Sequence, residues 1–310
     1  MSQMTRKNGA GPHLALIAVQ LIFGTWGIPG KIVLRVLPVF GLSALRIAGA
    51  AVMLTTICKL RGGIGRLKKK DWLLLVLCAL LGVVFNQWLF ATGLKLTTVV
   101  NTVLISTTIP VFTLLIGALI GTERATVRRF IGIALAAIGV FYLISPARAD
   151  LANGSRLGDL LILASSFMYG AYIAFSKRLV HSYGALTTTT WIFIVAIIPT
   201  APIGVASTLH TSFANAHFSF WLALVYILLV PTVLAYYLNA WALGRVPPST
   251  VAVYIYLQPL IVFVLAPIML GESLGLRAIV ASLLIFAGVL IVTRRRSIKV
   301  EDQVEVLESV

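Results

Sequence analysis

Ten apolar stretches constrain the fold of this chain more than any other feature of its sequence. A helix that crosses a lipid bilayer needs about 20 mostly apolar residues. Stretches of that kind cover residues 13–34, 39–60, 72–94, 98–121, 127–145, 157–178, 186–207, 219–243, 249–270 and 275–293. The connections between them are short and hold the glycines, prolines and charged residues that are typical of turns. We therefore predict an all-α polytopic membrane protein with ten transmembrane helices.

The composition agrees with a membrane protein. The chain is 59% hydrophobic and 11% charged, whereas a soluble domain carries about 25% charged residues. A net charge of +16 would suggest nucleic-acid binding in a soluble protein, but here the basic residues lie between apolar spans. Such residues set the orientation in the membrane, because cytoplasmic loops carry an excess of lysine and arginine. We expect no nucleic-acid partner.

The same basic residues predict which side each loop lies on. With the N-terminus inside, eighteen lysines and arginines fall on the cytoplasmic side and six on the opposite side. Both termini are therefore expected in the cytoplasm, and residues 294–310 form a cytoplasmic tail. A multi-pass protein with this orientation fits a bacterial inner membrane, with lipid as its surroundings.

Two distant segments of the sequence share one pattern. Residues 107–123 read "TTIPVFTLLIGALIGTE" and residues 256–272 read "YLQPLIVFVLAPIMLGE", each with proline fourth and glutamate last. The 149-residue offset also relates Arg128 to Arg277, and an offset of 146 relates Lys31 to Lys177. We predict two five-helix repeats, at 1–148 and 149–293. Because five is odd, the second repeat enters the membrane from the opposite side, as in many secondary transporters.

The paired segments, each followed by an arginine-containing turn and a helix of small residues, resemble the EamA branch of the drug/metabolite transporter superfamily. The stretch "FGTWGIPGK" near the start is similar to the opening helix of that family. The resemblance covers about residues 14–293. It implies a ten-helix transporter whose substrates are amino acids, metabolites or drugs, and it leaves the substrate itself open.

Polar and aromatic side chains inside the spans are the candidates for substrate binding, because polar groups in hydrocarbon need a partner or a water-filled cavity. Gln20, Gln87, Ser166, Tyr169 and Tyr236 are available in such positions. The residues that we expect to line a cavity between spans 1, 3, 4, 6, 8 and 9 are Trp26, Asn86, Trp88, Tyr172, Tyr237, Asn239, Tyr254 and Gln258. The alternative for the aromatic residues is a packing role.

Two prolines lie at matching depths of spans 4 and 9. Pro110 and Pro259 each remove a helix hydrogen bond, so they act either as hinges or as packing kinks. Lys31 and Lys177 lie near span ends, where they either extend toward the interface or contact a substrate carboxylate. Arg46 lies inside span 2, and the sequence shows no partner for it.

The sequence argues against strong proton coupling, because no span centre holds an aspartate, glutamate or histidine. Coupling through Glu123, Glu272 or Asp159, near span ends, is left open. The sequence does not favour an enzyme or a metal site either. His210 and His217 are seven residues apart with no aspartate, glutamate or cysteine beside them, which is poor spacing for either chemistry. No cofactor is expected.

We therefore predict a secondary transporter that moves small amphipathic metabolites outward by alternating access. Amino acids, aromatic or otherwise neutral, are the favoured substrates. A carrier for sugar nucleotides or phosphate esters is the alternative, but it should expose several basic residues to its cavity. Only Lys31, Lys177, Arg46 and Lys95 are available for that. A drug exporter of the same superfamily is a further alternative, and the oligomeric state is not predicted.

Overall fold

The structure is a computed structural model that describes residues 10–121, 155–209, 211–213, 216–271 and 275–293, with a few isolated positions between 126 and 142. Most of the fifth predicted span lies outside these residues. So do Glu123, Arg128, His210, Glu272, the side chain of Arg277, and residues 294–310.

Over residues 10–121, the first half of the chain contains six α-helices joined by two short segments of other helix types. They are α1 (Gly11–Leu34), α2 (Val39–Leu60), the 3-10 helix η1 (Lys69–Asp71), α3 (Trp72–Ala79), the π-helix η2 (Leu80–Phe85), α4 (Asn86–Leu96), α5 (Val99–Ser106) and α6 (Ile109–Leu119).

The second half repeats this order. It contains α8 (Ser155–Tyr183), α9 (Ala185–Thr208), α10 (Phe218–Ile227), the π-helix η4 (Leu228–Leu234), α11 (Ala235–Leu243), α12 (Pro248–Val253), the 3-10 helix η5 (Tyr254–Tyr256), α13 (Leu257–Leu270) and α14 (Leu276–Thr293). Every element in the described residues is helical.

Within the part of the chain that the structure describes, eight helical segments are long and apolar enough to cross a membrane. They run over 11–34, 39–60, 69–96, 99–119, 156–183, 185–208, 218–243 and 248–269. Each coincides with one of the predicted spans 1–4 and 6–9. A shorter apolar helix at Ala278–Gly288 lies within the predicted last span. The prediction of a polytopic helical membrane protein is confirmed, while the count of ten stays a prediction.

Several predicted spans are not continuous α-helices. The third and eighth contain π-helices at Leu80–Phe85 and Leu228–Leu234, which are equivalent positions in the two halves. The fourth is interrupted at residues 107–108 and the ninth at the 3-10 helix Tyr254–Tyr256. These interruptions again correspond, because 107 and 256 are 149 residues apart.

The first of these interruptions has a clear chemical cause. Pro110 is the second residue of α6, a position where its missing N–H would have no helical partner in any case. The hydroxyls of Thr107 and Thr108 donate to the carbonyls of Leu104 and Ile105, at 2.5 and 2.7 Å. Carbonyls beside the break therefore have partners inside the bundle, as hydrocarbon surroundings require.

The two interruptions also touch each other. The hydroxyl of Tyr256, in the 3-10 helix of the second half, donates to the carbonyl of Thr107 at 3.2 Å. Pro259, the third residue of α13, is buried just beyond this contact. The places where the two halves lose regular α-helix thus meet inside the protein.

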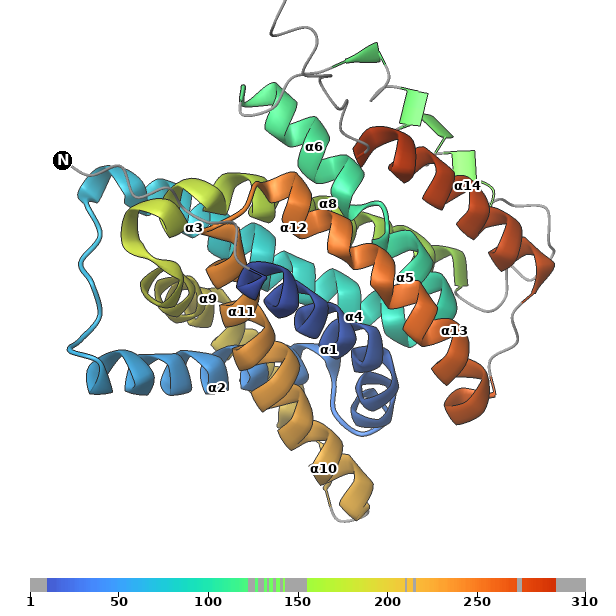
Figure 1. Cartoon of the computed structure of the whole chain (residues 1–310). Helices are drawn as coiled ribbons and strands as arrows, with labels where there is room; N and C mark the ends of the chain where they lie inside the picture. Colours follow the sequence, from blue (N-terminus) through green and yellow to red (C-terminus); the bar gives the residue numbers. More distant parts are fainter. Residues whose placement is uncertain are drawn as a thin grey trace, which may run out of the picture.

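Each half packs mainly against the other half. Helix α1 packs against α10, α11 and α13, and its counterpart α8 packs against α3, α4 and α6. Helix α2 packs along its own counterpart α9. Figure 1 shows α1 crossing the middle of the bundle, with α14 along one edge and α2 and α9 toward the other. Each of these helices therefore has neighbours that correspond to the neighbours of its counterpart in the other half.

Helices α1 and α8 run in opposite directions. Gly30, near the end of α1, lies against Leu94, near the end of α4. Gly158, near the beginning of α8, lies against Leu96 at the end of the same helix. The place where α1 ends is therefore the place where α8 begins. Glycine favours this close approach, because a Cβ atom at either position would lie 3.0 Å from these neighbours, closer than an ordinary contact.

Candidate functional site

A cavity lies where helices of the two halves meet. All six spans that the sequence indicated contribute to it, and α2 contributes as well. Its lining residues are Gln20, Phe23, Trp26, Gly27, Arg46, Asn86, Gln87, Phe90, Val99, Thr102, Val103, Ser106, Ile109, Ser165, Ser166, Tyr169, Ile173, Tyr236, Asn239, Val251, Ile255 and Gln258.

The cavity is large enough for a small solute. The centre of a water molecule can occupy about 90 Å³ of this cavity. A single bound water needs roughly 10–15 Å³ by the same measure. Its walls combine aromatic and aliphatic surface with amides and hydroxyls, a mixture that is typical of sites for small amphipathic molecules.

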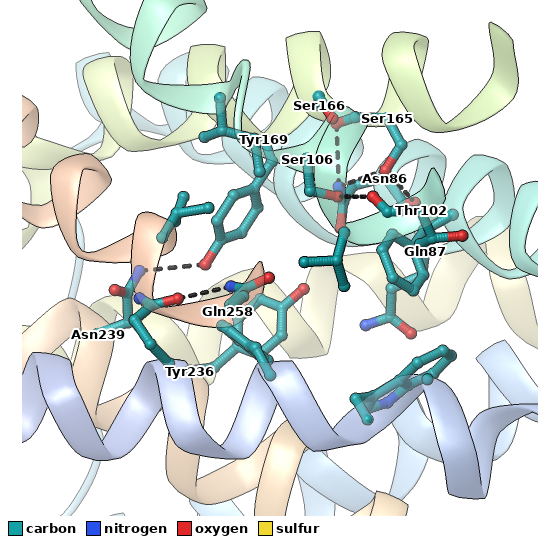
Figure 2. A pocket seen from close by; sticks show the side chains of 18 of the residues that line it. Asn86, Gln87, Thr102, Ser106, Ser165, Ser166, Tyr169, Tyr236, Asn239 and Gln258 are labelled. Atoms are coloured by element: carbon teal, nitrogen blue, oxygen red, sulfur yellow. Dashed lines mark hydrogen bonds between the residues drawn. The ribbon is translucent and has the colours of Figure 1, made fainter. Parts of the chain in front are cut away.

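Two hydrogen bonds cross one part of the cavity, the first between the two halves and the second between α8 and α11 of the second half. The Gln258 side chain donates from Nε2 to Oε1 of Gln20 at 2.6 Å. Asn239 donates from Nδ2 to the hydroxyl of Tyr169 at 3.1 Å. Figure 2 shows the hydrogen bond between Asn239 and Tyr169 and the side chain of Gln258, with Tyr236 between them and the group around Asn86. Amides that are satisfied in this way can lie within the membrane at low cost.

A second polar group connects α4 to α8. Asn86 donates from Nδ2 to the carbonyl of Ser165 at 3.1 Å and to its hydroxyl oxygen at 2.9 Å. The hydroxyls of Ser106 and Ser166 bond back to carbonyls four residues earlier in their own helices, at 2.7 and 2.9 Å. Their remaining lone pairs can still accept hydrogen bonds from a solute.

The buried cation of the cavity is Arg46. Its side chain is 5% exposed, and its Nε donates to Thr232 Oγ1 at 2.8 Å. The guanidinium carbon lies 5.0 Å from the centre of the Trp26 ring, within the range of a cation–π contact. The sequence could flag Arg46 as unusual but could not name these partners, since Thr232 lies in the other half.

Two further polar groups on this side of the cavity lack hydrogen bonds. Within the described residues, no hydrogen bond is formed by the two amide atoms of Gln87 or by the indole nitrogen of Trp26. Gln87 is only 2% exposed. A buried polar group without a partner costs free energy, so these atoms indicate where a bound solute or water would be stabilised.

Four of the eight predicted binding residues line the cavity: Trp26, Asn86, Asn239 and Gln258. The other four lie elsewhere. Trp88 packs against the rings of Phe40 and Phe85. Tyr172 is buried against Gly82, behind the cavity wall.

The side chains of the remaining two face other neighbours, although residues next to them in the chain line the cavity. Tyr237 lines a separate groove beside Trp241 and Arg245. The hydroxyl of Tyr254 is hydrogen-bonded to Nδ1 of His13 at 2.6 Å. These contacts fit the packing role that the sequence leaves open as the alternative for the aromatic residues.

The two lysines do not line the cavity. Lys177 donates to the carbonyls of Leu243 and Val246, at 2.5 and 2.8 Å. A cation at the end of α11 offsets the partial negative charge of the helix terminus. Lys31 lies near the end of α1, outside the lining residues.

Asp159 lies near the beginning of α8 and is buried against the turn between α4 and α5. Its carboxylate accepts from the hydroxyl of Thr97 at 2.5 Å and from Nδ2 of Asn101 at 3.2 and 3.3 Å. These contacts hold the turn, and Asp159 does not line the cavity. Among the residues that the structure describes, no three of His, Cys, Asp or Glu gather as they would at a metal site.

Sequence comparison decides the family. A model of the EamA-like transporter family matches the chain twice, at residues 11–145 and 156–294. The chain belongs to the EamA-like transporter family. The resemblance that the paired proline segments indicated is therefore confirmed, and the family is one of transporters rather than enzymes.

The relatives match either nearly the whole chain or more than half of it. A protein of Archaeoglobus fulgidus, described as an uncharacterized transporter, is 27% identical over 92% of this chain and 98% of its own length. A protein of Salmonella typhimurium, described as a probable amino-acid metabolite efflux pump, is 30% identical over 58% of this chain and 62% of its own length. A related Escherichia coli protein with the same description is also 30% identical over 58% of this chain and 62% of its own length.

The fold has a solved counterpart. One crystal structure superposes with a TM-score of 0.67 at 19% identity, covering 92% of this chain and 96% of that chain. At this identity the match speaks for the fold alone.

Proposed function

We propose that this EamA-family protein is a secondary transporter that exports small amphipathic metabolites, foremost neutral amino acids. The observation that carries the proposal is the cavity between the halves, which pairs aromatic and aliphatic surface with Gln20, Asn239 and Gln258. An amino acid with an apolar side chain matches such walls at both of its ends.

The favoured substrate class draws on relatives as well as on the cavity. The Salmonella and E. coli proteins are described as probable amino-acid metabolite efflux pumps. The described lining contains one basic residue, Arg46. A carrier for sugar nucleotides or phosphate esters would need more charge-assisted donors than that, so we rank it below amino-acid export.

Alternating access between two inverted halves is the proposed mechanism. The opposite directions of α1 and α8 and the exchanged packing partners of the two halves support it. Two halves related in this way can close either end of the cavity by equivalent movements. The contact between Tyr256 and Thr107 lies where both halves are interrupted, and Pro110 and Pro259 beside it are the proposed hinges.

We further propose that the protein lies in a prokaryotic cell membrane with both termini in the cytoplasm. The loop over residues 59–70 carries six lysines and arginines, while its counterpart over 209–217 carries none. This asymmetry is the one expected for a cytoplasmic and an outer loop, respectively.

Flux measurements in liposomes that contain the purified protein test the proposal. Phenylalanine, leucine and glutamine are loaded inside, and their exit is followed with and without a pH gradient. We expect exit above that of protein-free liposomes and unaffected by the gradient, because the described lining contains no acidic residue. If only phosphate esters or cationic drugs leave, the amino-acid proposal is wrong. If exit follows the gradient, Asp159, Glu123 and Glu272 become the residues to substitute.

A further inference from the structure

We propose that Arg46 binds a carboxylate of the substrate, so that the transported compounds are monocarboxylates, with or without an amino group. This inference rests on the proposed transport function and specifies its substrate chemistry. It begins from an arginine that the fold holds buried at the cavity wall, with no acidic residue among the described lining. A cation inside a membrane protein is costly unless a partner compensates it.

The contact with Thr232 fixes the direction of the guanidinium. The Thr232 hydroxyl has one hydrogen, and it donates this hydrogen to the carbonyl of Ile227 at 2.6 Å. Its oxygen is therefore the acceptor for the Nε–H of Arg46 at 2.8 Å. Thr232 lies in the π-helix η4 next to Pro231, where the regular hydrogen-bond pattern is altered.

The other donors of Arg46 have no such partner. Within the described residues, Nε is the guanidinium atom with an assigned hydrogen bond, and the ring of Trp26 adds a contact to the flat face. The two terminal nitrogens form the planar fork that a carboxylate accepts with both oxygens.

Neighbouring polar groups favour an anion at the same place. The indole N–H of Trp26 and the amide of Gln87 are buried and without hydrogen bonds. Arg46, Trp26 and Gln87 all line the cavity, and the Arg46 guanidinium lies over the Trp26 ring. Together they offer several donors to one oxyanion, and one cation suits a carboxylate better than a phosphate dianion.

The architecture itself does not require this cation. By the 146-residue offset, the position in α9 that corresponds to Arg46 is Ile192, which is 1% exposed and packs in the apolar core. The two halves otherwise share their order of elements and their packing partners. An arginine on only one side of such a pair is the pattern expected for ligand recognition rather than for support of the fold.

The test compares acids with their amides in the same liposomes. Exit of phenylalanine and 3-phenylpropionate is measured beside that of phenylalaninamide and phenylpropionamide, for the wild type, Arg46→Gln and Arg46→Lys. We expect Arg46→Gln to slow both acids by about tenfold or more while the amides change by less than about twofold. Arg46→Lys, which keeps the charge without the fork, should fall between them.

Thr232→Val tests the positioning of the guanidinium. It removes the acceptor that fixes the direction of Arg46, so it should slow acid exit by less than Arg46→Gln does and change amide exit by less than about twofold. The inference is overturned if Arg46→Gln slows acids and amides equally, or if phenyl phosphate leaves faster than either acid in the wild type.

A binding measurement separates this inference from the proposed function. If the wild type exports none of these compounds, amino-acid transport is wrong, and Arg46 is then tested by thermal stabilisation of the purified protein with 3-phenylpropionate. Stabilisation of the wild type that is lost in Arg46→Gln would uphold the carboxylate site. An equal response of the two proteins, or no response of either, would refute it.

Discussion

At the residue scale, the hydrogen bond between Gln20 and Gln258 makes a sharp test of the cavity. Both amides are buried, and they join α1 of one half to α13 of the other at 2.6 Å. We expect Gln258→Ala to reduce amino-acid exit by about fivefold, because a lost hydrogen bond costs about 1 kcal/mol and the freed amide of Gln20 no longer has a fixed position.

A double-mutant cycle distinguishes a shared role from two separate ones. If the two amides act as a pair, Gln20→Ala combined with Gln258→Ala should be no slower than either single variant. The melting temperature of each variant in detergent serves as the control for folding. Exit at the wild-type rate in Gln258→Ala would exclude the residue from the binding site.

The sequence shows which polar and aromatic residues lie in the spans, but it does not always show which way each side chain points. Tyr254 and Gln258 are four residues apart and would share one face of a regular helix. The 3-10 helix at Tyr254–Tyr256 changes the angle per residue, and only Gln258 faces the cavity. In the unbroken helix α11 the same rule holds, since Tyr237 and Trp241 line one groove. The sequence shows that Arg46 is an unusual charge inside a span. It does not reveal the partner Thr232, because that residue is 186 positions away in the chain.

At the element scale, the pairing of α2 with α9 depends on close approach at small residues. A Cβ atom on Gly204 of α9 would lie 2.1 Å from Cβ of Ala44 and 3.0 Å from the carbonyl oxygen of Phe40, both on α2. Gly204→Ala must therefore move the helices apart, and we expect a loss of about 1–3 kcal/mol in stability. The melting temperature of the purified protein in detergent measures this loss.

Gly49 provides a matched control on α2. Its added Cβ would meet only the end of the Leu228 side chain, at 3.4 Å. Alanine also favours a helix over glycine by about 0.5–1 kcal/mol, so Gly49→Ala should leave the melting temperature unchanged or raise it. Equal melting temperatures for Gly49→Ala and Gly204→Ala would show that α2 and α9 do not depend on this contact.

The spans could be predicted from the sequence because a bilayer demands a long apolar run, and eight of them have helical counterparts close to the predicted boundaries. The π-helices and interruptions inside them could not. Residues 80–85 are apolar throughout, and residues 228–234 are apolar apart from Thr232, with Pro231 marking only the second π-helix. Hydrophobic periodicity therefore contains no signal of a change in helix type. Such changes depend on packing across the halves, which one chain segment does not reveal.

At the scale of the whole molecule, the proposed inversion of the two halves places equivalent residues on opposite sides of the membrane. Lys69, at the start of the η1–α3 segment, and His217, directly before α10, correspond by an offset of 148 and are both exposed. The excess of basic residues around Lys69 predicts a cytoplasmic position for it. We therefore expect His217 to face the outside.

Labelling of single cysteines measures this directly. Cys58 and Cys78 are both buried and are first replaced by alanine, after which Lys69→Cys and His217→Cys are introduced separately. A maleimide that cannot cross the membrane should label His217→Cys in intact cells and Lys69→Cys only after the cells are permeabilised. If both cysteines react from the same side, the halves enter the membrane in the same direction. Alternating access by exchange of equivalent halves would then have no structural basis, whatever the substrate.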